Sequence, residues 1–291
     1  MKRYKWHSIL IIWLVVLLAS SVVGCTPNPL YIYENGALQV GGDGEPIELT
    51  NNPDATNPTY GELVAFIQED LTDTNDYLEN PYIGYVCADF AEDVHNNAEA
   101  AGIRAAWVSI DFEGSDEGHA SNAFETTDLG LVYIDCTGEN FASKLNLRLV
   151  ETDEGFSFED EGPTNWDAIA YIEIGKEYGL IPIDKAKSLL YSFYEEYEQQ
   201  WQEYKELLSE YNSDVEKYNQ EVKGKVYTQG SPELARIEAW KARLEKQGRI
   251  INKLGEELGN VWFEPKGIVK DIHILSLTNN SIILPHPLIN R

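Results

Sequence analysis

Basic and sulfur-containing residues are scarce in this sequence of 291 residues. It has 22 Lys and Arg against 49 Asp and Glu, which gives a formal net charge of −27. Such a surface repels the phosphates of nucleic acids and argues against a nucleic-acid-binding function. The three cysteines are too few for a dense disulfide framework, and no Cys, His, Asp and Glu cluster has zinc-like spacing. We therefore expect no metal and no cofactor.

The N-terminus has the pattern of an export signal. Three basic residues within the first five positions precede an unbroken apolar run over residues 9–18. The following Val-Val-Gly-Cys resembles the lipobox of bacterial lipoproteins, which predicts a signal peptide over residues 1–24 and lipidation of Cys25. A plain transmembrane anchor and an ordinary signal with a chance cysteine stay open as alternatives. The lipoprotein and anchor interpretations both place the chain outside the cytoplasm and hold it at the membrane.

A polar stretch follows the signal. Residues 25–57 are rich in Gly, Pro, Asn and Asp, so we expect a linker with at most one short strand at residues 30–33. Patterned sequence begins after it, and we assign residues 58–180 to one domain. Thr59 followed by Glu62 has the spacing of a capping box and predicts that a helix starts there.

Within this domain, helical and strand-like segments occur together, which predicts an α+β fold. An alanine-rich helix is expected over residues 88–101, where Gly102 occupies the usual position after a helix C-terminus. Strands are expected over residues 105–110, 119–126 and 131–135. The last two flank a Thr-Asp-Leu-Gly turn, which indicates a hairpin.

From residue 183 the pattern changes to a coiled coil over residues 183–260. Apolar and aromatic residues recur at alternating intervals of three and four in two series, separated by a break at residues 224–232. The first series is Ala186, Leu190, Tyr194, Tyr197, Trp201, Tyr204, Leu208, Tyr211, Val215, Tyr218 and Val222, and the second is Ile237, Trp240, Leu244, Gln247, Ile251, Leu254 and Leu258. Two such seams predict an antiparallel helical hairpin. The tail over residues 261–291 returns to strand-like sequence and is expected to pack back on the first domain.

Cys87 is placed to act as a nucleophile. It stands where the alanine-rich helix begins, and the unpaired N–H groups of a helix N-terminus stabilise a thiolate and a developing oxyanion. A thiolate needs a base, and His119 follows Gly118 at the start of a strand. The imidazole in turn needs an orienting acceptor, which Asp135 supplies at the end of the next strand.

The parity of the hairpin tests this idea. His119 and Asp135 are sixteen residues apart, and side chains of paired strands share a face only if the loop has the right length. A three-residue loop over residues 127–129, with Gly130 at a bulge, places both on one face, whereas a two-residue loop separates them. The proposed constellation therefore predicts an odd loop.

Each residue also has an ordinary structural interpretation. Cys87 alone is most often a small buried residue or the partner of Cys136 in a disulfide, a bond that exported proteins favour. His119 alone can bond to backbone, and Asp135 alone can cap a turn. Cys136 is expected to be buried on the other face from the site.

Three further residues are candidates for the same site. Asn122 is a rival partner for the imidazole, but strand alternation places it on the opposite face from His119. Asp128 is a second rival and is expected in the turn. His95 lies two helical turns beyond Cys87 and is expected at the surface or in a capping role.

Taken together, the order of these motifs resembles the transglutaminase-like superfamily. The motifs are Tyr85-Val86-Cys87-Ala88-Asp89-Phe90-Ala91, the helix ending at Gly102, Gly118-His119-Ala120-Ser121-Asn122 and Tyr133-Ile134-Asp135-Cys136-Thr137. The resemblance covers residues 59–137 and implies a papain-like α+β core, with a nucleophile helix on an antiparallel sheet. It departs from the common pattern at Ser121, where many members have an aromatic residue, and at Cys136, where many have proline.

The resemblance implies that Cys87 is the nucleophile, His119 the base and Asp135 its orienting partner. Tyr85 is a candidate donor to the oxyanion. The implied activity is that of a thiol enzyme that hydrolyses or transfers amide or peptide bonds through a thioester, on a protein or peptide substrate outside the cell. The alternative is a non-catalytic envelope module that binds a partner or serves as a scaffold through its helical hairpin.

Overall fold

The computed structural model describes residues 29–34, 36–80, 82–138, 142–144, 148–152, 155–159 and 166–276. The expected signal peptide and Cys25 lie outside these residues. Among the helices in the described part of the chain, none combines the length and the apolar character needed to cross a bilayer.

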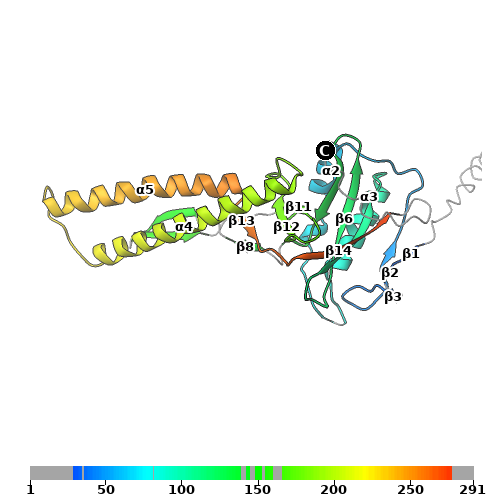
Figure 1. Ribbon diagram of the computed structural model, residues 1–291. Coiled ribbons are helices and arrows are strands. Elements are labelled where there is room, and N and C mark those ends of the chain that lie inside the picture. The colour runs from blue at the N-terminus through cyan, green and yellow to red at the C-terminus, as the bar shows by residue number, and fades with distance from the viewer. Residues whose placement is uncertain are drawn as a thin grey trace, which may run out of the picture.

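The centre of the molecule is a six-stranded antiparallel sheet in the order β12-β11-β7-β6-β5-β14 (Figure 1). The strands are β5 (Ala106–Phe112), β6 (His119–Thr126), β7 (Gly130–Asp135), β11 (Ala168–Tyr171), β12 (Gly179–Pro182) and β14 (Val269–Ser276). The three strands expected from the sequence are adjacent in this sheet. The strand expected in the tail also forms, and it pairs with β5 at the sheet edge.

Two helices accompany the sheet, α2 (Tyr60–Glu69) and α3 (Cys87–Ala100), with a short 3₁₀ helix, η1 (Thr72–Thr74), between them. The predicted capping box is present, because the Glu62 N–H donates to the Thr59 hydroxyl and the Glu62 carboxylate accepts from the Thr59 N–H. Helix α3 packs its apolar side against β6 and β7 in one core cluster. The predicted α+β class is confirmed.

The hairpin between β6 and β7 has the predicted odd loop. Thr126 pairs with Gly130, which leaves residues 127–129 as a three-residue connection. Gly130 has a φ of 78°, a conformation that glycine adopts without steric cost. In this register Asp135 lies opposite Ser121, so that it shares a face with His119, two residues earlier.

The segment that we expected to be a linker packs on the domain from residue 29 onward. It forms β1 (Leu30–Tyr31), β2 (Tyr33–Glu34), β3 (Ala37–Leu38) and β4 (Glu48–Leu49). Its residues Ile32, Ile47 and Leu49 are buried against Ala91 and Trp107. These apolar residues are separated by turns and have no regular period, which is why composition alone indicated a tether.

The carboxylate of Asp89 ties this segment to the nucleophile helix. It accepts hydrogen bonds from the N–H of Gly42 at 2.8 Å and from the N–H of Val86 at 2.7 Å. Gly42 also lies against the backbone of Gly84, where a Cβ on Gly42 would come within 2.6 Å of the Gly84 carbonyl carbon. The N-terminal segment thus braces the loop that leads into Cys87.

The predicted helical hairpin consists of α4 (Tyr191–Val222) and α5 (Pro232–Leu258), which project together from the sheet (Figure 1). The α4 seam is buried as predicted from Tyr194 to Tyr218, although Leu190 only caps the helix and is exposed. In α5 Gly248 takes the place of the predicted Gln247, which is exposed, and Gly255 is buried beside the predicted Leu254, which packs half-buried against the same core.

Glycine is the reason for that difference. A Cβ on Gly255 would lie 2.9 Å from the Tyr204 hydroxyl, so the bare backbone makes room for a large ring of α4. A glycine contributes no apolar side chain, and a search for apolar periodicity therefore passes over it.

At the base of this helical hairpin, called the arm below, β13 (Val261–Phe263) follows α5 and pairs with β8 (Ala142–Lys144). A further hairpin is formed by β9 (Arg148–Thr152) and β10 (Gly155–Glu159). The chain then passes from β13 through residues 264–268 into β14. This short connection carries Lys266, which contacts His119.

Candidate functional site

Three elements bring Cys87, His119 and Asp135 together. Cys87 is the first residue of α3, His119 is the first of β6, and Asp135 is the last of β7. The Nε2 of His119 lies 2.7 Å from the Oδ2 of Asp135, and both side chains are buried. The half-buried thiol of Cys87 forms a hydrogen bond with the His119 ring. The structure thus joins the three residues selected from the sequence.

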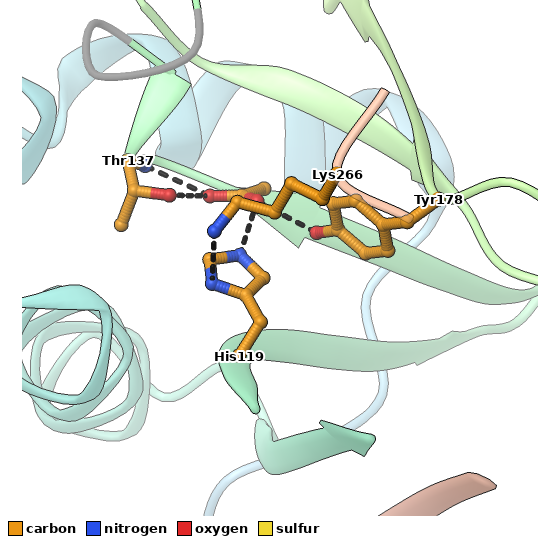
Figure 2. Close-up of polar contacts among 5 residues, drawn as sticks. His119, Thr137, Tyr178 and Lys266 are labelled. Carbon is orange, nitrogen blue, oxygen red and sulfur yellow. Dashed lines mark hydrogen bonds and ion pairs between the residues drawn. The ribbon is translucent and has the colours of Figure 1, made fainter. Parts of the chain in front are cut away.

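Asp135 is held by four donors (Figure 2). Besides His119, the Tyr178 hydroxyl donates to its Oδ2 at 2.6 Å, while the N–H and the hydroxyl of Thr137 donate to its Oδ1. Burial by itself raises the pKa of Asp135, but His119, Lys266 and Thr137 outweigh it and hold the pKa well below its usual range. An ionised carboxylate only accepts, so Nε2 of His119 carries a proton.

The other nitrogen of the imidazole contacts a lysine. The Nζ of Lys266 lies 2.9 Å from the Nδ1 of His119, and Figure 2 shows the lysine side chain pointing at the imidazole ring. Lys266 belongs to the connection between β13 and β14. Burial lowers the pKa of its ammonium group, while Asp135 and Cys87 raise it, and the net direction is downward.

The environment of Cys87 favours the thiolate. Burial raises the pKa of the thiol, but the charges of His119 and Lys266 and hydrogen bonds from His119 and the Ala120 backbone bring it below its usual value. The pKa of His119 is lowered by burial and by Lys266 but raised more strongly by Asp135 and the thiolate, so the net direction is upward. A nucleophile and a base of this kind are what acyl transfer from an amide requires.

The hydroxyl group that is hydrogen-bonded to the Cys87 backbone comes from Tyr77 and not from the predicted Tyr85. The Tyr85 hydroxyl donates to the carboxylate of Asp93 at 2.5 Å and accepts from Asn75 at 3.1 Å. Tyr85 is thus turned along α3 toward Asp93, so the expectation that it serves the oxyanion is not met. The Tyr77 hydroxyl forms a hydrogen bond with the Cys87 backbone and lies near its thiol.

Cys87 and Cys136 are both free thiols, which contradicts the disulfide alternative. Cys136 is buried as expected, and its thiol is hydrogen-bonded to the carboxylate of Asp167. Burial and the charge of Asp167 raise the pKa of Cys136 well above its usual value. The pKa of Cys136 is therefore higher than that of Cys87, and Cys87 ionises at the lower pH.

The two rival partners of the imidazole are engaged elsewhere, as the sequence predicted. Asn122 donates from its side chain to the carbonyl of Ala91 in α3 at 2.8 Å. Asp128 lies in the hairpin loop and accepts from the N–H of Tyr60 at 2.8 Å, which caps α2. Neither residue contacts His119 through these bonds.

His95 is buried, contrary to the expected surface or capping position. Its Nε2 lies 3.1 Å from the Oδ1 of Asn51, so Nε2 carries the proton, and Nδ1 meets no hydrogen-bond partner among the described residues. Burial lowers the pKa of His95 to about 4. Asn51 comes from the N-terminal segment, which the sequence had suggested would be a tether, and its packing over α3 explains the error.

Acid is therefore expected to destabilise the fold through His95. The unfolded chain binds a proton near pH 6.5 and the folded chain only near pH 4, so stability falls as the pH drops through this interval. The loss approaches about 3 kcal/mol in the free energy of unfolding. Urea denaturation at several pH values, with His95→Gln as the comparison, measures it, and an equal acid dependence in both proteins would contradict the assignment.

Four residues of the site escaped the sequence analysis: Tyr77, Thr137, Tyr178 and Lys266. Thr137 offered a local signal, because an aspartate often accepts from the residue two positions later. Tyr178 and Lys266 offered none, since they lie 43 and 147 residues from their partners Asp135 and His119. Among the described residues, no three His, Cys, Asp or Glu side chains gather as a metal site would need.

No family model, curated protein or solved structure matches this chain. The geometry of the site is then the evidence for a function: a half-buried thiol at a helix N-terminus is hydrogen-bonded to an imidazole that a buried carboxylate orients.

Proposed function

We propose that the protein is a thiol enzyme of the transglutaminase-like kind, which acts on amide or peptide bonds through a thioester on Cys87. The single observation that carries this proposal is the continuous hydrogen-bonded series from the Cys87 thiol through His119 to Asp135. A carboxylate behind an imidazole, next to a nucleophile at a helix N-terminus, is the arrangement of triad enzymes on several unrelated folds. The helix α3 on an antiparallel sheet is also the arrangement expected of a papain-like core.

The proposed reaction begins with attack of the Cys87 thiolate on the amide carbonyl carbon. The oxyanion that forms is stabilised by the Cys87 N–H and the Tyr77 hydroxyl, which lie together at the N-terminus of α3. His119 supplies the proton with which ammonia or an amine leaves, and Asp135 stabilises the imidazolium. Water then attacks the thioester and releases the carboxylic acid and the thiol, while an amine in place of water gives transamidation.

The proposed location is the outer face of the membrane, with a lipid on Cys25. A protein or a peptidoglycan peptide is then a substrate within reach. Hydrolysis is the favoured outcome, because water is always present whereas a second amine needs its own binding site. The alternative function, a non-catalytic module that presents the hairpin of α4 and α5 to a partner, requires no activated thiol.

Alkylation separates the two functions. Iodoacetamide at about pH 6 to 7 is expected to label Cys87 much faster than Cys136, since only the first thiol has a lowered pKa. His119→Ala is expected to slow labelling of Cys87, and His273→Ala, which changes a more exposed histidine of β14, to leave it unchanged. Peptide mapping by mass spectrometry gives both rates. Equal and slow labelling of the two thiols would favour the non-catalytic module.

A further inference from the structure

We propose that Lys266 is a positioning residue of this site, whose ammonium group is the counter-charge that keeps Cys87 in the thiolate form. The inference deepens the proposed function and rests on it. It assigns a fourth charged group to the constellation, from a part of the chain 147 residues away from His119.

The contact between the two nitrogens carries the first step. Nζ of Lys266 and Nδ1 of His119 are 2.9 Å apart, which is hydrogen-bond distance. Nε2 is committed to Asp135, so Nδ1 is the ring nitrogen that serves Cys87. The contact with Lys266 therefore sets the ammonium charge beside the nitrogen through which His119 acts on the thiol.

The position of Lys266 is secured by the backbone on both sides of Tyr178. The Tyr178 N–H donates to the Gly267 carbonyl at 2.9 Å, and the Lys266 N–H donates to the Tyr178 carbonyl at 3.4 Å. The Tyr178 hydroxyl donates to Asp135. One residue thus holds the lysine-bearing connection and orients the carboxylate, which is the preorganisation that a charge needs to act at short range.

The charge balance carries the second step. The Cys87 thiolate and the Asp135 carboxylate are two anions that share one imidazole, and the charge of Lys266 acts on both of them. The hydroxyls of Tyr178 and Tyr77 also face the thiol and stay neutral, because burial raises the pKa of each.

Two acidic residues also act near the site. Glu79 and Glu117 are close enough to act on Tyr77, which contacts Cys87. Negative groups disfavour a second anion, so they oppose the thiolate. The ammonium group of Lys266 is then the counter-charge that offsets them, and its removal is expected to leave the Cys87 thiol protonated near neutral pH.

Lys266→Met tests the inference by the pH dependence of Cys87 alkylation. Loss of a positive charge that acts on a thiolate raises the thiol pKa by roughly one unit or more, so labelling at about pH 6 is expected to fall tenfold or more. Lys266→Arg keeps the charge and is expected to restore most of the rate. Lys270→Met, four residues along the chain on an exposed position of β14, is the matched control and is expected to behave as the wild type.

An unchanged midpoint of the alkylation profile in Lys266→Met would overturn the inference, while fast labelling of wild-type Cys87 would leave the proposed function in place. If the wild-type thiol is itself unreactive, the proposed function fails first.

Discussion

Asp135→Asn is expected to lower the rate of the thioester reaction by roughly a thousandfold or more, the scale seen when the carboxylate of a triad becomes an amide. The carboxylate of Asp135 accepts from four donors and has none to offer. An asparagine turns an NH₂ group toward one pair of these donors. The imidazole then loses the acceptor that keeps the proton on Nε2.

Two readouts check this expectation. The rate of Cys87 alkylation at about pH 6 to 7 reports the thiolate, and thermal unfolding reports the buried polar cluster, which is expected to lose about 1–3 kcal/mol when a donor is left unpaired. Asp128→Asn, at the other end of the same hairpin, is the matched control and is expected to leave alkylation unchanged. Wild-type alkylation in Asp135→Asn would show that the carboxylate does not govern the thiol.

The same carboxylate makes a pH-dependent contribution to stability. Its pKa in the folded protein is far below the value of about 4 that an aspartate has in the unfolded chain. The unfolded state therefore binds the proton first as the solution becomes acidic. The contribution is complete above about pH 4 and is lost as the pH falls below it, and Asp135→Asn is expected to flatten this part of the stability curve.

Trp201→Ala is expected to lower the free energy of unfolding by about 3–5 kcal/mol, the cost of removing a large aromatic side chain from a packed core. Trp201 is fully buried in the seam of α4. Its ring makes edge contacts with Tyr197 and Tyr204, at centroid distances of 6.3 and 5.2 Å. A substitution leaves a cavity that rigid neighbouring rings do not fill.

Chemical denaturation monitored by circular dichroism at the helix band measures this loss. Leu207→Ala on the same helix is the control, because Leu207 is 47% exposed and its truncation is expected to change stability by less than about 0.5 kcal/mol. Equal stability of the Trp201 and Leu207 variants would mean that the arm does not pack through the α4 seam.

Local rules succeeded where neighbouring residues decide the structure. The capping box at Thr59, the glycine that follows α3 and the three-residue hairpin loop each depend on a few consecutive residues. The seam of α4 was recovered for the same reason, since one helix buries every third or fourth side chain. The odd length of the hairpin loop then predicted that the side chains of His119 and Asp135 share a face of the sheet, without information on its other strands.

Local rules failed where distant segments supply the partner. Residues 29–57 have a loop-like composition, yet their scattered apolar side chains find a surface on α3 and β5. That same packing buries His95, which a surface helix would have exposed. Tyr85 was selected for its nearness to Cys87 in sequence, but its hydroxyl extends along the helix to Asp93.

The sequence alone determined which residues stand at the ends of elements: Cys87 at the start of a helix, His119 and Asp135 at the open end of a hairpin. Helix capping and strand alternation act over a few residues, so they can be recognised in the sequence. Only the tertiary structure placed Tyr178 and Lys266 beside them, because a hydrogen bond across 43 or 147 residues depends on how the whole chain closes. The protonation states of Cys87, His119 and Asp135 depend on this tertiary packing, since charge and burial act through space.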